Sequence, residues 1–169
     1  MEQLNAKSKY FEYKQMYNAE PEVIFPLLCF NREYEWIDGW QAKIIRSNSG
    51  FMEKDCIFIS YMKPQQYDYL FSGEKEVVWN VFTHNKEKLL IESVNYVDKL
   101  FIIDFKIQCK KEENGKTSAL FSHKYTGISD NGNIFIEKII SEEMFVKQQI
   151  FLEKSMNYFL KSGKLFKLG

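Results

Sequence analysis

Two polar side chains have the chemistry of a general acid and a general base, and each interrupts an apolar, strand-like segment. Glu92 lies in the segment LIESVNYV, and His123 lies in ALFSHKY. If both face one cavity, burial moves their pKa values toward neutrality and the pair can transfer protons. The structural alternative is that Glu92 reaches solvent at a bulge, while His123 hydrogen-bonds a tyrosine of the cavity wall. Tyr96 and Tyr125 carry the same ambiguity, because a tyrosine can orient a ligand or supply apolar area.

Other residue types point away from metal and cofactor chemistry. The two histidines and three cysteines have none of the short spacings of structural zinc sites. The sequence has no GxSxG motif, and its eight glycines occur singly, unlike those of a phosphate-binding loop. We therefore expect no metal and no cofactor. We expect Cys29, Cys56 and Cys109 to be free and mostly buried thiols, as in a reducing cytosol.

The composition indicates one globular domain without a nucleic-acid partner. The chain has 169 residues, of which 45% are hydrophobic and 17% aromatic, and no linker-like tract interrupts it. These features predict a single domain over residues 1–169. The 23 Lys and Arg residues balance 23 Asp and Glu residues, whereas a nucleic-acid-binding surface needs a basic excess.

No segment indicates export or a membrane span. The N-terminal stretch MEQLNAKSK is polar, and the longest apolar run, Val23 to Phe30, is far shorter than the ~20 residues that cross a bilayer. The lysines of the C-terminal tail, Lys161, Lys164 and Lys167, are too few for stable membrane anchoring. We expect a cytoplasmic protein of undetermined oligomeric state, with a homodimer as one option.

Hydrophobic periodicity then predicts the elements that position the polar residues. Alternating segments predict seven strands over residues 9–17, 40–47, 55–62, 76–84, 88–97, 100–111 and 116–127. Two short helices are expected after the first strand, one over VIFPLLCF behind Pro21 and one over Arg32 to Ile37. From about Asn133 to Lys161 the chain lacks proline and glycine, which predicts one long helix. Asp130, Asn131 or Asn133 is expected to cap its start, and Gly163 its end.

This order of elements, with the segment AEPEVIFPLLCFNREYEWIDGW (19–40), resembles the START-like, or SRPBCC, superfamily. The resemblance spans nearly the whole chain and implies an α+β helix-grip fold. In that fold a curved, seven-stranded antiparallel sheet wraps a long C-terminal helix, and a cavity between them takes apolar ligands. Birch-pollen-allergen-like proteins and polyketide cyclase/dehydrase-like proteins share it, so the resemblance selects no single chemistry.

Hairpin geometry predicts which side chains face the cavity. A two-residue turn at Asp98-Lys99 would pair Val97 with Leu100 and turn Glu92 inward. A three-residue loop, Glu113-Asn114-Gly115, places His123 inside. Glu92, Phe105 and His123 would then form one row across three strands. The residues expected to contact a ligand are Trp79, Val81, Val94, Tyr96, Phe101, Ile103, Phe105, Phe121, His123, Tyr125, Ile140, Met144 and Leu152.

These observations support three functional hypotheses. The leading one is a protein that binds a small or medium hydrophobic molecule, such as a lipid or polyketide, in the cavity. The second is a cyclase- or dehydratase-type enzyme with Glu92 and His123 as proton carriers, and the third is a chaperone-activator-like interaction module. The loop from Met62 to Gly73 carries an unusual apolar load. We expect it to fold over a cavity entrance as a lid or to pair with another chain.

Overall fold

The protein is built on a single antiparallel sheet. The structure, a computed structural model, describes residues 3–62 and 75–167, so the expected lid loop lies outside the described residues. The sheet order is β1-β7-β6-β5-β4-β3-β2. Its strands are β1 (Ser8–Tyr17), β2 (Gln41–Arg46), β3 (Ile57–Met62), β4 (Lys75–Asn85), β5 (Leu90–Val97), β6 (Phe101–Lys111) and β7 (Thr117–Gly127). The predicted seven-stranded antiparallel sheet is therefore confirmed.

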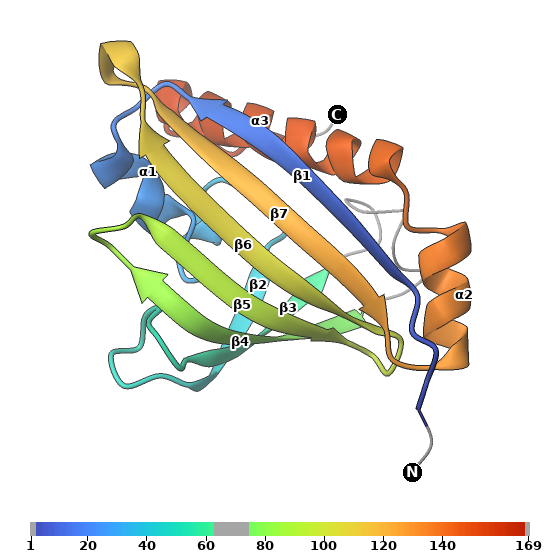
Figure 1. Ribbon diagram of the computed structural model, residues 1–169. Coiled ribbons are helices and arrows are strands. Elements are labelled where there is room, and N and C mark those ends of the chain that lie inside the picture. The colour runs from blue at the N-terminus through green and yellow to red at the C-terminus, as the bar shows by residue number, and fades with distance from the viewer. Residues whose placement is uncertain (1–2, 63–74, 168–169) are drawn as a thin grey trace.

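The helices cover one face of this sheet. They are α1 (Pro21–Leu27), the 3-10 turn η1 (Glu33–Glu35), α2 (Asp130–Lys138) and α3 (Glu142–Ser162), with a further 3-10 turn, η3 (Glu113–Gly115), between β6 and β7. Figure 1 shows α3 running across the sheet, with α2 at one end of it. The curved sheet, the two short helical pieces after β1 and the long C-terminal helix agree with the predicted helix-grip fold. None of the helices in the described part of the chain is long and apolar enough to span a membrane.

The C-terminal helical region is divided in two, whereas the sequence predicted one helix from Asn133 to Lys161. The chain leaves helical geometry after α2, and fully buried Ile140 packs into the core at the break. Ser141 then caps α3, its hydroxyl accepting a hydrogen bond from the Met144 amide at 3.2 Å. α2 is capped by Ser129 instead of the expected acidic or amide residue. Gly163 ends α3 in the left-handed conformation, as predicted, with φ of 66°.

The hairpin between β6 and β7 has the predicted register. The Glu112 amide donates to the Lys116 carbonyl at 2.8 Å, and Gly115 takes a positive φ of 72°. Phe105 consequently lies opposite His123. The inward face of β7 is buried at the expected positions, which are Ala119, Phe121, His123 and Tyr125.

The hairpin between β5 and β6 differs from the prediction by one residue. Asp98, Lys99 and Leu100 form a three-residue turn, in which the Leu100 amide donates to the Val97 carbonyl at 2.9 Å. Val97 therefore pairs with Phe101 and not with Leu100. Because side chains alternate along a strand, this single-residue shift turns every side chain of β5 to the opposite face.

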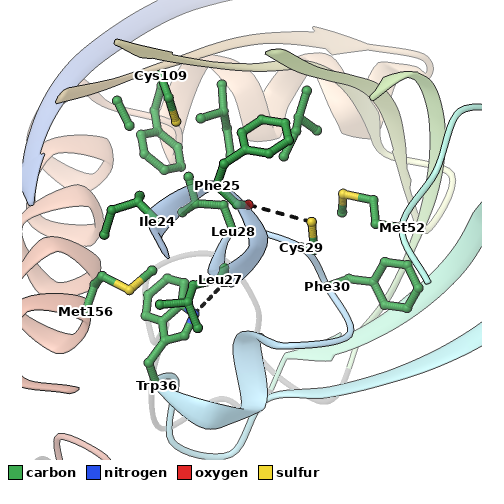
Figure 2. Close-up of a cluster of buried hydrophobic side chains, with 14 of the residues drawn as sticks. Ile24, Phe25, Leu27, Leu28, Cys29, Phe30, Trp36, Met52, Cys109 and Met156 are labelled. Atoms are coloured by element: carbon green, nitrogen blue, oxygen red, sulfur yellow. Dashed lines mark hydrogen bonds between the residues drawn. The ribbon is translucent and has the colours of Figure 1, made fainter. Parts of the chain in front are cut away.

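The buried apolar side chains form two clusters. One surrounds α1 and includes Trp36, whose indole nitrogen donates to the Leu27 carbonyl at 2.7 Å (Figure 2). The other lies between the sheet and α2, around Phe101 and Tyr125. Trp79 packs against both clusters. The space where the two clusters meet, beneath α3, holds the candidate site.

Candidate functional site

A cavity of about 80 Å³ lies between the inner face of β4–β7 and the helical elements η1 and α3. Its wall is mostly aromatic or aliphatic. The sequence-predicted ligand-contacting residues that line it are Trp79, Phe101, Ile103, Phe105, Phe121, His123, Tyr125 and Leu152. Most of the residues that were expected to contact a ligand therefore line one cavity.

Three other expected ligand-contacting residues are buried but lie outside the cavity wall. Val81 packs in the cluster around α1. Ile140 and Met144 pack with the residues beneath α2, because the helix breaks at residues 139–141 and carries them toward that end of the sheet. These side chains belong to the hydrophobic core.

Glu92, Val94 and Tyr96 face away from the cavity, so their expected placement is wrong. The three-residue turn at the end of β5 shifts the register, and Ile91, Ser93, Asn95 and Val97 take the inner positions instead. On the outer face the Glu92 carboxylate lies 3.8 Å from the Lys106 ammonium. Glu92 and His123 are thus on opposite sides of the sheet, and the proposed acid–base pair does not exist.

His123 is held in the cavity wall by aromatic neighbours and one hydrogen bond. Its Nδ1 lies 3.1 Å from the Tyr125 hydroxyl, and its ring centre lies 4.9 Å from that of Phe105 and 5.0 Å from that of Phe145. Burial lowers the pKa of His123 to about 3. The imidazole is therefore neutral near pH 7. Its Nε2 is buried without a hydrogen-bond partner among the described residues.

Asn95 gives the cavity a second unpaired polar atom. Its Oδ1 accepts a hydrogen bond from the Ser93 hydroxyl at 2.8 Å, whereas its Nδ2 has no partner in the described part of the chain. The Ser93 hydroxyl contacts only one of the two amide atoms, so either orientation of the amide leaves the other one unsatisfied. The sequence did not indicate Asn95 as a site residue, because its inward orientation depends on the observed register of β5.

The α3 side of the cavity is also polar. Gln149 is fully buried, and its Oε1 accepts a hydrogen bond from Gln15 of β1 at 2.7 Å. The Tyr17 hydroxyl donates in turn to Gln15, which fixes this chain of side chains. The neighbouring Gln148 leaves its Oε1 without a partner among the described residues.

Glu33 is a cavity residue that the sequence reasoning missed. It lies on η1, and its backbone carbonyl accepts from the Trp36 amide at 3.1 Å. Burial raises the pKa of its carboxyl group to about 8. Its position in an aromatic stretch with several acidic residues gave no periodic pattern that would separate an inward carboxyl group from an outward one.

A second hollow, of about 630 Å³, lies on the other side of α1. It contains Cys29 and His84, whose Sγ and Nε2 atoms are 3.5 Å apart. Burial raises the pKa of the Cys29 thiol to about 12 and lowers the pKa of His84. A thiol with that pKa is protonated at neutral pH and is a poor nucleophile. All three cysteines are free and buried, which confirms that part of the sequence prediction.

The comparisons with known proteins agree with the fold. No family model and no curated protein matches this sequence. The solved structure of Ara h 8.0201 is similar with a TM-score of 0.66 and 13% identity, over 92% of this chain and 99% of that one. The ZhuI aromatase/cyclase from Streptomyces sp. R1128 is similar with a TM-score of 0.65 and 7% identity, over 95% of this chain and 100% of that one.

A third similar structure is a point mutant of norcoclaurine synthase from Thalictrum flavum in complex with a transition-state analogue. Its TM-score is 0.63 with 13% identity, over 95% of this chain and 100% of that one. At such identities the likeness defines the fold and not the chemistry. The chain therefore has a helix-grip fold, as these three structures do.

Proposed function

We propose that this protein binds a small, largely apolar molecule with a hydrogen-bonding group in the cavity between β4–β7 and α3. The observation that carries the proposal is the presence of His123 Nε2 and Asn95 Nδ2, both without partners among the described residues, in an aromatic wall. Each unsatisfied buried polar group costs about 1–3 kcal/mol. Two of them in one aromatic wall are what a site for a polar ligand group would contain. A ligand hydroxyl or carbonyl group would satisfy one or both.

The dimensions of the cavity favour a small molecule. Its volume is about 80 Å³, whereas an engineered apolar cavity of about 150 Å³ accommodates benzene. A molecule with one ring therefore requires the wall to widen slightly. Gln148 and Leu152 lie on one face of α3 at a spacing of four residues, and their side chains are the part of the wall that would move.

A larger side chain on the sheet side of the cavity tests whether the ligand binds there. Ile103 and Ile102 are neighbours on β6, with Ile103 in the cavity wall and Ile102 opposite Tyr96 on the outer face. We expect purified wild-type protein to bind 4-methylphenol in calorimetric titrations, Ile103→Phe to lose this binding, and Ile102→Phe to retain it. Equal binding by all three proteins would place the ligand elsewhere. No binding of 4-methylphenol or of related one-ring molecules by folded wild-type protein would contradict the proposal.

The alternative functions gain less support from the geometry. The cyclase or dehydratase hypothesis relied on Glu92 and His123, which lie on opposite faces of the sheet. The interaction-module hypothesis needs an apolar outer face, yet Asp104 and Lys106 occupy that face of β6 as exposed residues. A cytoplasmic location remains part of our proposal, supported by the free, buried cysteines.

A further inference from the structure

Glu33 is half-buried, and its carboxyl group is not paired within the described part of the chain. It lies in the cavity wall, and among the described residues its side chain forms no hydrogen bond or ion pair. No lysine or arginine is among the described residues that line the cavity. The nearest arginine in sequence, Arg32, is bound instead by Glu35, with two nitrogen–oxygen distances of 2.6 and 2.8 Å. The described part of the cavity wall thus contains an acidic group and no basic side chain.

The three tryptophans of the chain all line this cavity. Each indole nitrogen already donates to a protein acceptor: Trp36 to the Leu27 carbonyl, Trp40 to the Phe30 carbonyl and Trp79 to the Ser60 hydroxyl. These bonds fix the rings and leave the tryptophans no hydrogen to donate to a ligand. What the rings offer is their apolar and π surface, which attracts cations more strongly than the rings of phenylalanine or tyrosine do.

The local fold places Glu33 and one of these tryptophans on the same short turn. Glu33 and Trp36 are three residues apart across the turn η1, where the Trp36 amide donates to the Glu33 carbonyl at 3.1 Å. In a 3-10 turn, side chains three residues apart lie on the same side. The same short element therefore presents both a carboxyl group and an indole ring to the cavity.

We propose that the molecule bound here is a small organic cation, whose ammonium group lies against Glu33 and the tryptophan rings while its apolar or hydroxyl-bearing part extends toward Asn95 and His123. The inference rests on the proposed function, because it names the ligand class of the same cavity. A cation would supply the positive charge that the described part of the wall lacks. The cost of removing the cation from water would be offset by the carboxylate and the ring faces.

The binding of a cation is expected to depend on pH through Glu33. Burial raises the pKa of its carboxyl group to about 8, so the free protein holds it mostly protonated at pH 7 and ionised at pH 9. Among the described residues, the titratable groups that interact with Glu33 or share the cavity with it are Tyr17, Cys29, His123 and Tyr125. Burial raises the pKa of both tyrosines and of Cys29 and lowers that of His123 to about 3, so none of the four changes charge between pH 6 and pH 9.

The test uses two molecules of nearly the same shape that differ in charge. Choline carries a permanent positive charge, and 3,3-dimethylbutan-1-ol replaces its nitrogen with carbon. By calorimetry at pH 9, wild-type protein should prefer choline by at least about tenfold. Its affinity for choline should fall by about 100-fold from pH 9 to pH 6, following the ionised fraction of a group with a pKa near 8. Its affinity for the alcohol should not change.

Two variants on the turn η1 distinguish the effect of the Glu33 carboxyl group from that of a neighbouring carboxylate. Glu33→Gln should lower the affinity for choline to about that for 3,3-dimethylbutan-1-ol and abolish its pH dependence. Glu35→Gln, whose carboxylate contacts Arg32, should behave as wild type. A wild-type measurement adds an independent readout: choline binding at pH 7 should release about one proton, visible as a dependence of the binding heat on the buffer.

The outcomes distinguish the two proposals. If the protein binds 3,3-dimethylbutan-1-ol or 4-methylphenol at least as tightly as choline at pH 9, the cation inference is wrong and the proposed binding function stands. If choline binds without proton release, Glu33 is not the countercharge and the inference is also wrong. If none of the three molecules binds, the proposed function and the inference fail together.

Discussion

His123 Nδ1 lies 3.1 Å from the Tyr125 hydroxyl, two residues along the same inward face of β7. Both side chains are buried, and the imidazole packs against the rings of Phe105 and Phe145. Because this bond uses Nδ1, the unpaired Nε2 is the ring nitrogen left for a ligand.

Removal of the Tyr125 hydroxyl should leave His123 Nδ1 without its partner. We expect Tyr125→Phe to lower the free energy of unfolding by about 1–2 kcal/mol, the cost of one lost buried hydrogen bond. Urea denaturation measures the effect. Tyr13→Phe is the matched control, since the Tyr13 hydroxyl makes a longer bond, of 3.3 Å, to Glu153 in a less buried place. A loss in Tyr125→Phe no greater than in this control would show that the bond does not support the imidazole.

His123 should remain neutral well below the usual histidine range. Burial lowers its pKa to about 3, so the unfolded chain takes up a proton near pH 6.5 that the folded chain does not. This difference makes the folded state lose stability as pH falls from 6.5 toward 3 and contributes nothing above 6.5. NMR of the imidazole resonances between pH 4.5 and 8 should show no protonation of His123. A midpoint near 6.5 would contradict the buried environment described here.

Glu33 should make the protein less stable as pH rises, whereas His123 makes it less stable as pH falls. Its folded pKa of about 8 lies above the unfolded value, so the folded chain holds a proton that the unfolded chain loses between pH 4.5 and 8. Wild-type stability should therefore fall with rising pH in that window. Glu33→Gln removes the ionisation, and we expect it to be more stable than wild type at pH 9 but nearly equal at pH 4.5, in urea titrations.

The control for this prediction is a carboxylate with the opposite shift. Lys147 lowers the pKa of Glu143 on the surface of α3. Glu143→Gln should therefore be less stable to unfolding than wild type at high pH. If Glu33→Gln shows no gain relative to wild type between pH 4.5 and pH 9, the carboxyl group is solvated and is not buried beside the cavity.

Glu92 should be dispensable for both folding and binding. It is partly exposed on the outer face, and its carboxylate lies 3.8 Å from the Lys106 ammonium group. Exposed pairs contribute about 0–1 kcal/mol, so Glu92→Gln should change the free energy of unfolding by less than about 1 kcal/mol and leave the affinity for 4-methylphenol unchanged. A loss of binding without a loss of stability would show that Glu92 contacts the ligand and would contradict its placement on the outer face.

The sequence predicted the fold better than the site because the two depend on different information. Alternation along Phe101–Lys111 and the glycine at position 115 were enough to place Phe105 and His123 on the inner face. The turn after Val97 offered no such marker. Asp98 and Lys99 both take positive φ values, of 34° and 59°, which is uncommon for residues with side chains and is not visible in their types. That one turn decided whether Glu92 or Asn95 faced the cavity.

The break in the C-terminal helix and the role of Glu33 were hidden for related reasons. Ser141 is a preferred N-cap residue type, but serines also occur inside helices, and only the structure shows that the chain breaks there, next to fully buried Ile140. Glu33 lies on a turn too short to have a hydrophobic period, so only the packed structure shows that it lines the cavity.

The most direct test of the account is an NMR measurement of where 4-methylphenol lies when bound. We predict intermolecular nuclear Overhauser effects from its ring and methyl protons to the Phe105 ring and the Leu152 methyl groups, which lie on opposite walls of the cavity. Effects confined to Phe51 and Met52, in the hollow on the other side of α1, would contradict the account.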